Sequence, residues 1–336
     1  MTKAECVRDF GQLFMMAIDG PRLPADVAEY FAAFRIGGVI LFSDNYENPS
    51  QLRQLTAELQ KNCSDPERPL LIATDHEGGS VQRFTEGFTR VPPMAQLGSG
   101  PTEVTCSVHS LAARELRQCG INFNLAPVAD LSAAGDAGAI GNRSFGLDPE
   151  QVSRHVAAAI DGITLERLLC CVKHFPGHGA TSVDSRQELP TVSMSREAME
   201  AGLQPFRAAI RAGVPAVMTA HIVYPNAGDA DSPASMSEYW VSDVLRRELG
   251  WKGVVITDAL EMKSLRSRWT PEYCGFRALM AGVDILLYYK EAHQFRAFDE
   301  LRRSLAKDEL DIKRIALSLQ RVRHAKQALV RSPTRT

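Results

Sequence analysis

The sequence predicts a single TIM-like (β/α)8 barrel, an α/β fold. Eight short apolar runs of strand length recur along the chain, and segments with helical periodicity separate most of them. The runs are continuously apolar rather than alternating, which is typical of parallel strands buried on both faces. Eight alternations without a break in composition favour a closed barrel over an open sheet. The runs are Leu13–Ile18, Gly38–Phe42, Leu70–Thr74, Ile121–Ala126, Leu168–Val172, Ala216–Thr219, Val254–Thr257 and Val283–Tyr288.

The first helix with a clear amino-terminal signal follows the second run. Asn48 can cap this helix and Pro49 occupies its first turn, after which Leu52, Leu55 and Leu59 fall on one face. This pattern predicts a helix packed against the barrel.

A second helix is predicted after the fifth run. Met199, Leu203, Phe206 and Ile210 lie on one face, although Pro205 should kink the helix. At the end of the chain a basic cluster is expected to form the solvated face of a terminal helix. This cluster contains Arg314, Arg321, Arg323 and Lys326.

Length and composition are compatible with one large domain. The 336 residues are 45% hydrophobic and 23% charged, which provides enough apolar material for a sizeable core. No linker or low-complexity tract divides the chain, so residues 1–330 are predicted to form one barrel, followed by a frayed tail at 331–336. The 38 basic and 40 acidic side chains give a net charge of -2, which does not suggest a nucleic-acid partner.

The cysteines and the amino terminus predict a cytoplasmic protein. Seven cysteines without regular spacing favour a reducing compartment. The first residues carry no basic region followed by a cleavage site, and no apolar run approaches the roughly 18 residues of a membrane span. Neither a membrane association nor an oligomeric state is predicted.

Polar residues close four of the eight apolar runs. These residues are Asp75, Lys173 with His174, His221 and Asp258. A single polar residue at a strand end commonly makes a turn or a cap. The carboxyl ends of barrel strands meet at one rim, however, so the agreement in position predicts an acid–base site that binds a polyol there.

The most informative stretch of the chain is the loop Lys173-His174-Phe175-Pro176-Gly177-His178-Gly179, which precedes Asp184-Ser185-Arg186. Five further segments belong with it: Gly37–Phe42 with Asn45-Tyr46, Thr74–Gly79 with Val81–Phe84, Gly120–Val128, Asn142–Gly146 and Val255–Met262. Together and in this order, the six segments resemble those of glycoside hydrolase family 3, and the chain is similar to its single-domain β-N-acetylglucosaminidases over nearly its whole length.

The resemblance implies a retaining glycosidase that removes terminal β-linked N-acetylglucosamine, with peptidoglycan (muropeptide) fragments as the substrate class. It assigns Asp258 as the nucleophile that attacks the anomeric carbon. It assigns the contacts to sugar hydroxyls and the acetamido group to Asp75, Arg83, Arg143, Lys173 and His174. His221 matches a histidine near the same subsite, or else stabilises its loop. No metal or organic cofactor is implied.

The chain departs from the family pattern at Arg186, where relatives usually carry a histidine oriented by an aspartate that corresponds to Asp184. A guanidinium cannot give up a proton near neutrality. Either Asp184, His178 or another mobile-loop residue supplies the proton, or the site binds a sugar without turnover, or another strand-end group acts instead. A further departure is Ser80, where relatives commonly carry arginine.

Two other functions follow from these departures. The first is a catalytically silent sugar-binding or regulatory protein on the same barrel, which Arg186 and Ser80 favour and the retained Asp258 opposes. The second is a phosphate-handling barrel enzyme, in which Arg143, Lys173 and Arg186 would cluster on an anion. The sequence lacks a Gly-rich phosphate loop after the seventh or eighth run, which weighs against the second.

Overall fold

The computed structural model describes residues 1–64, 68–132, 139–178, 181, 188–289 and 291–330. The predicted tail 331–336 and the loop residues Asp184 and Arg186 lie outside the described residues. In the described part no helix is long and apolar enough to cross a membrane.

The core is a sheet of eight parallel strands in the order β10-β1-β2-β3-β6-β7-β8-β9. The two end strands also meet: Ile256 of β9 forms a parallel bridge with Ile285, just before β10, and Thr257 N donates a hydrogen bond to Ile285 O (3.0 Å). The sheet therefore closes into the predicted barrel. Each predicted run overlaps one strand, and the strand of the fifth run continues three residues past Val172. The strands are β1 (Phe14–Ala17), β2 (Gly38–Leu41), β3 (Leu71–Thr74), β6 (Phe123–Asn124), β7 (Leu169–Phe175), β8 (Ala216–Thr219), β9 (Val254–Thr257) and β10 (Leu286–Leu287).

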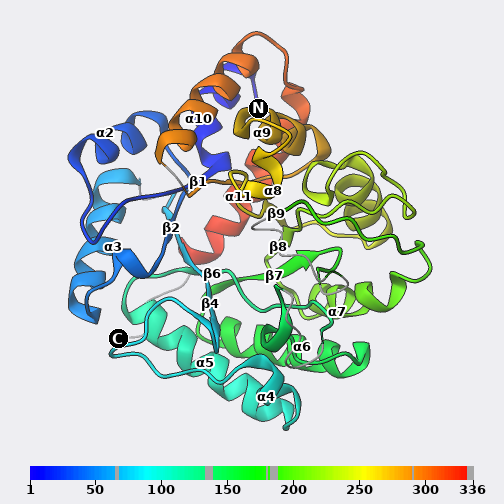
Figure 1. Ribbon diagram of the computed structural model, residues 1–336. Helices are drawn as coiled ribbons and strands as arrows, with labels where there is room; N and C mark the ends of the chain where they lie inside the picture. Colours follow the sequence, from blue (N-terminus) through cyan, green and yellow to red (C-terminus); the bar gives the residue numbers. More distant parts are fainter. Residues whose placement is uncertain (65–67, 133–138, 179–180, 182–187, 290, 331–336) are drawn as a thin grey trace.

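Helices surround the strands in Figure 1. The longer ones are α2 (Ala25–Phe34), α3 (Pro49–Cys63), α5 (Thr102–Gln118), α6 (Pro149–Leu165), α7 (Glu200–Arg211), the π-helix η5 (Tyr239–Glu248), α9 (Pro271–Ala281), α10 (Glu291–Ala306) and α11 (Ile312–Val330). The short elements are α1 (Lys3–Asp9), η1 (Phe10–Leu13), η2 (Ser43–Asn45), α4 (Met94–Gly98), η3 (Gly141–Arg143), η4 (Ala234–Met236), α8 (Lys263–Arg266) and the hairpin of β4 (His76–Gly78) and β5 (Val81–Gln82).

The predicted cap and apolar face of α3 are confirmed. The Asn48 side chain accepts hydrogen bonds from the backbone N–H groups of Ser50 and Gln51, which satisfies two donors of the first turn. Leu52, Leu55 and Leu59 are buried on the inner face. In α7 the helix continues past Pro205, and Leu203 and Phe206 are buried as predicted.

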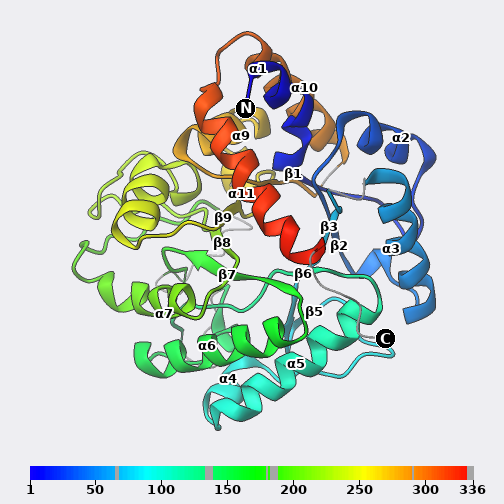
Figure 2. The ribbon, with the colours of Figure 1, turned by 180° about the vertical axis from the view of Figure 1, so that it is seen from behind.

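Helix α11 covers the amino-terminal end of the barrel. Val322 and Ala325 contribute to one small cavity together with residues at the starts of five strands. In Figure 2, α11 crosses the central strands at this end. The opposite end, where the strands finish, is therefore the end at which a ligand can enter.

The prediction that the basic cluster of α11 is a solvated face holds for Arg323, which is exposed, but was wrong for Lys326 and Arg321. Lys326 is 1% exposed, and its Nζ donates hydrogen bonds to Gln12 Oε1 (2.8 Å) and Gly37 O (2.7 Å). Arg321 pairs with the buried carboxylate of Asp284 (3.0 Å). A basic residue on a terminal helix usually faces solvent, but here the helix packs onto a barrel end that provides buried acceptors.

Candidate active site

A cavity of about 300 Å³ lies at the carboxyl ends of the strands. This volume is at the lower end of the range for small-molecule sites, which suits a single sugar ring. Six charged residues line it: Asp75, Glu77, Arg83, Arg143, Lys173 and Asp258. The remaining lining is largely apolar and includes Phe42, Met218, Met262, Leu287 and Tyr289, so the cavity has a charged part and an apolar part.

The cavity gathers six of the residues predicted from the sequence. Asp75 directly follows β3, Lys173 and His174 lie within β7, and Asp258 directly follows β9. Parallel strands deliver these side chains to one rim because all their carboxyl ends point the same way. Arg83, after the β4–β5 hairpin, and Arg143, at the end of η3, complete the set.

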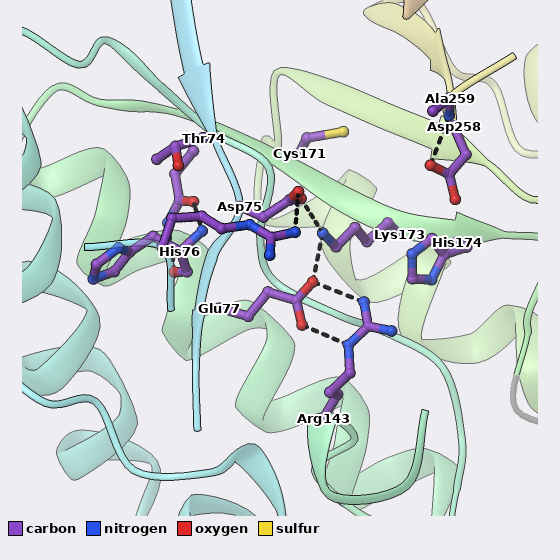
Figure 3. Close-up of polar contacts among 12 residues, drawn as sticks. Thr74, Asp75, His76, Glu77, Arg143, Cys171, Lys173, His174, Asp258 and Ala259 are labelled. Atoms are coloured by element: carbon purple, nitrogen blue, oxygen red, sulfur yellow. Dashed lines mark hydrogen bonds and ion pairs between the residues drawn. The ribbon is translucent and has the colours of Figure 1, made fainter. Parts of the chain in front are cut away.

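Lys173 joins two carboxylates. Its Nζ lies 2.8 Å from Asp75 Oδ1 and 2.6 Å from Glu77 Oε1, and its side chain is 2% exposed (Figure 3). Burial alone would lower the pKa of Lys173, but the two carboxylates outweigh it and raise the pKa. Lys173 is therefore a fixed cation at neutral pH.

Arg143 and Arg83 extend this chain of charges at its two ends. Arg143 makes a two-pronged contact with Glu77, with Nε 2.7 Å from Oε2 and Nη2 2.8 Å from Oε1. Arg83 Nη2 lies 3.2 Å from Asp75 Oδ2. Burial opposes ionisation of Asp75 and Glu77, yet the neighbouring cations hold the pKa of each carboxyl below its usual range. These side chains are thus rigid and charged before any ligand binds.

Asp258 lies apart from this network. Its Oδ1 accepts a hydrogen bond from the backbone N–H of Ala259 (2.7 Å), and the side chain is half-buried. That bond occupies one side of the carboxylate, and Asp258 also lines the cavity. Its position suits a carboxylate that acts on a ligand rather than one that only pairs with a neighbouring cation.

A second group lies around Asp130, a residue that the sequence analysis did not select. His174 Nδ1 is 2.7 Å from Asp130 Oδ2, and the His178 backbone N–H donates to Asp130 Oδ1 (2.5 Å). Both histidine side chains line the cavity, and burial lowers the pKa of His178 to about 4. His178 is therefore neutral at pH 7, and a neutral imidazole is a poor proton donor to a leaving group.

His221 does not line the cavity. Its Nδ1 is 2.7 Å from Ser235 Oγ and its Nε2 is 3.0 Å from Ala259 O. Both ring nitrogens are occupied, and burial lowers the pKa of the ring. Of the two interpretations offered by the sequence, these contacts favour stabilisation of the segment that carries Asp258.

Two of the residues missed by the sequence analysis left weak signals. Glu77 lies two residues after the strand-end Asp75, and Asp130 lies in the segment that follows the fourth apolar run. Neither residue closes an apolar run, so the strand-end rule that selected Asp75, Lys173 and Asp258 passes over them. Ser80, by contrast, is exposed and does not line the cavity.

The charges of the described lining balance. Asp75, Glu77 and Asp258 contribute three carboxylates, and Arg83, Arg143 and Lys173 contribute three cations. A balanced set of fixed donors and acceptors suits a neutral polyol better than an anion such as phosphate. Among the described residues, no group of three or more His, Cys, Asp and Glu side chains could hold a metal ion.

Comparison with known proteins identifies the family to which the chain is related. Residues 7–325 match the family described as the glycosyl hydrolase family 3 N terminal domain. The chain is 41% identical to a β-hexosaminidase of Neisseria meningitidis serogroup C (strain 053442), over 82% of this chain and 77% of the relative. It is 40% identical to a β-hexosaminidase of Tolumonas auensis, over 81% of each chain.

Solved structures agree on the fold. A family 3 β-N-acetylglucosaminidase from Paenibacillus sp. str. FPU-7 superposes with a TM-score of 0.93 at 36% identity, covering 100% of this chain but only 64% of that longer protein. NagZ from Neisseria gonorrhoeae, in complex with N-trifluoroacetyl-D-glucosamine, gives a TM-score of 0.79 at 37% identity, covering 95% and 94% of the two chains.

The barrel, its cavity and these similarities define the protein as a glycosidase. Among glycosidases, the chain belongs to glycosyl hydrolase family 3, and residues 7–325 correspond to the N-terminal domain of that family.

Proposed function

We propose that the protein is a retaining β-N-acetylglucosaminidase, carried by one catalytic domain over residues 1–330, with Asp258 as its nucleophile. The observation that carries this proposal is the position of Asp258 in the same cavity as a rigid, charge-balanced set of polar side chains. The β-hexosaminidase names of relatives about 40% identical support the choice of sugar.

Asp258 would act in two stages. Its carboxylate would stabilise the positive charge that develops on the sugar ring and then form a covalent bond to the anomeric carbon. Water would later break that bond and release the sugar with its original configuration. The backbone N–H of Ala259 holds one carboxylate oxygen at 2.7 Å, so the other oxygen is the one available for attack.

The polar network would hold the sugar in place. Asp75 offers acceptors, Lys173 and the two arginines offer donors, and His174 offers a ring nitrogen to the cavity. Because their mutual ion pairs already fix these groups, little conformational entropy is lost when a ligand binds.

The chain would differ from its relatives in the group that supplies a proton to the leaving group. Arg186, by the resemblance, occupies the position of the usual histidine, and a guanidinium cannot serve as the acid. Without a general acid, hydrolysis slows by about 10²- to 10⁴-fold for a leaving group that needs protonation. We therefore infer an altered acid/base, with activity retained best on glycosides whose leaving group is already acidic.

The natural substrates would be N-acetylglucosamine-containing fragments of peptidoglycan in the cytosol. A silent sugar-binding protein is the second candidate, and Arg186 is the specific observation in its favour. In that case the cavity would bind N-acetylglucosamine and the bond would stay intact.

The deciding experiment compares hydrolysis of an activated aryl β-N-acetylglucosaminide with hydrolysis of the natural disaccharide N,N′-diacetylchitobiose. Asp258→Asn should lower kcat/KM on the aryl glycoside by about 10⁴-fold or more without unfolding the protein. Asp19→Asn is a matched control, because Asp19 follows β1 near the same rim but is exposed and outside the cavity lining. Equal rates in the wild type and Asp258→Asn would refute the nucleophile assignment.

Arg186→His tests the inferred acid/base. It should raise kcat/KM on the disaccharide by about 10²-fold or more and change the aryl glycoside far less. Equal gains on both substrates would exclude an acid/base role for this position. Binding of N-acetylglucosamine without turnover of either substrate would establish the silent alternative.

A further inference from the structure

The segment that follows β6 runs beside β7 at the point where the site residues lie. Ala129 N donates a hydrogen bond to Lys173 O (2.7 Å), and Val128 forms a parallel bridge with Lys173. These contacts bring Asp130, which follows Ala129, close to His174, which follows Lys173.

Asp130 is a buried hub that holds three parts of the site. Its side chain is fully buried and accepts from His174 Nδ1 (2.7 Å) and from the His178 backbone N–H (2.5 Å). Its carbonyl oxygen accepts from Ser144 Oγ (2.6 Å), next to Arg143. Asp130 does not line the cavity, so it touches the ligand only through these neighbours.

The chemistry of Asp130 decides which nitrogen of His174 carries a proton. A carboxylate can only accept, so the 2.7 Å contact requires hydrogen on Nδ1. In the neutral ring Nε2 then has a lone pair and no hydrogen. Because His174 lines the cavity and its Nδ1 is occupied, Nε2 is the nitrogen left for a ligand.

We propose that Asp130 is a positioning residue that fixes the orientation and tautomer of His174, so that Nε2 accepts a hydrogen bond from a sugar hydroxyl. This inference rests on the proposed sugar-binding function for its ligand, but the tautomer itself is a property of the free protein. Asp130 thereby makes His174 Nε2 a hydrogen-bond acceptor, which favours a sugar substituent that can donate a hydrogen bond, such as a hydroxyl.

Asp130→Asn tests the proposal because the structure fixes how the new amide must lie. The backbone N–H of His178 can only donate, so the amide oxygen has to stay on that side. The amide NH2 then faces His174 Nδ1, which must become an acceptor. The neutral ring should therefore move its hydrogen to Nε2, turning an acceptor toward the cavity into a donor.

The first measurement is the protonation of His174 in free protein labelled with ¹⁵N at histidine. Two-bond proton–nitrogen NMR correlations identify the protonated nitrogen, and His174→Gln assigns the signals by their loss. We expect hydrogen on Nδ1 in the wild type and on Nε2 in Asp130→Asn. The matched control is Asp284→Asn, which alters an equally buried aspartate at the other barrel end and should leave the pattern unchanged. An unchanged tautomer in Asp130→Asn would overturn the proposal.

The second measurement is a double-mutant cycle on the aryl glycoside. Asp130→Asn alone should lower kcat/KM by about 10²-fold, as expected for a misplaced contact. In a His174→Ala background the same change should cost less than about 3-fold, because the residue through which it acts is gone. Multiplicative losses would show that Asp130 does not act through His174.

The two measurements distinguish a failure of the proposed glycosidase function from a failure of the proposed role of Asp130. If no N-acetylglucosaminide is hydrolysed, the proposed function fails, and the cycle is run instead on the Kd of N-acetylglucosamine measured by NMR titration. A tautomer change without any effect of His174 on binding would refute the sugar contact and leave the proposed nucleophile untouched.

Discussion

The two ends of the barrel each bury a lysine, and the two lysines differ in what they face. Lys173 at the carboxyl ends is 2% exposed, pairs with two carboxylates and lines a cavity of about 300 Å³. Lys326 at the amino ends is 1% exposed and donates to Gln12 Oε1 and Gly37 O beneath α11. Burial of a charged group therefore does not mark a functional site by itself. Access to a cavity large enough for a ligand does, and the cavity that Lys326 lines holds only about 10 Å³.

Matched variants of the two lysines should give the largest contrast. Lys173→Met should destabilise the fold by about 3 to 5 kcal/mol, because two buried carboxylates lose a shared cation, and should lower kcat/KM by about 10²-fold or more. Lys326→Met should cost about 1 to 3 kcal/mol through unsatisfied acceptors and leave kcat/KM within about twofold. Urea unfolding and aryl glycoside hydrolysis measure the two effects.

A loss of activity in folded Lys326→Met equal to that in Lys173→Met would contradict this difference between the two ends of the barrel. It would mean that packing at the covered end controls the geometry of the cavity.

Asp284 extends the comparison to the carboxylates. It is fully buried at the covered end, where it pairs with Arg246 (2.6 Å) and Arg321 (3.0 Å) and accepts from the Val255 N–H (2.9 Å). Asp284→Asn keeps the shape and removes the charge, so unfolding should become easier by about 3 kcal/mol. Measured below its new melting temperature, kcat/KM should stay unchanged. A fall in kcat/KM of tenfold would contradict the division of roles.

His76 is a buried titratable residue at the open end that has no access to the cavity. It follows Asp75, yet its ring packs against Phe84 and Phe88 (centroids 6.1 and 5.8 Å) and does not line the cavity. Burial, and after it the charge of His109, lowers its pKa from 6.5 to about 4. The unfolded chain therefore binds the proton first as pH falls, so this contribution is complete above 6.5 and is lost progressively toward about 4.

The consequence is a smaller, pH-dependent effect on stability. Between pH 7 and pH 5, wild type should lose about 2 kcal/mol more unfolding free energy than His76→Phe. Urea unfolding at the two pH values measures the difference. An identical loss in both proteins would show that His76 titrates normally in the fold.

The sequence predicted the fold almost completely, because each strand of a parallel barrel is buried on both faces and therefore appears in the sequence as one apolar run. All eight runs overlap a strand of the closed sheet. It also predicted that Asp75, Lys173 and Asp258 share one rim, because each follows an apolar run and the parallel strands all point the same way, although β7 continues past Lys173 to Phe175. His221 obeyed the same rule of position, but its ring turns toward Ser235 and Ala259 O.

The contacts that sequence reasoning missed join distant segments. Arg143 and Glu77 are 66 positions apart, and His174 and Asp130 are 44 apart. Periodicity and local motifs carry no information at such separations. The prediction of a solvated basic face on α11 failed at Arg321 for the same reason, because its buried acceptor, Asp284, lies 37 residues earlier in the chain.

The balance of three carboxylates and three cations in the described lining also bears on ionic strength. Opposed charges a few ångströms apart produce a field that fades quickly outside the cavity, and added salt then has little left to screen. A neutral glycoside should therefore arrive by unassisted diffusion, and its KM should stay nearly constant from low to high salt. Such a cavity would work equally well in dilute buffer and in a crowded, ion-rich solution.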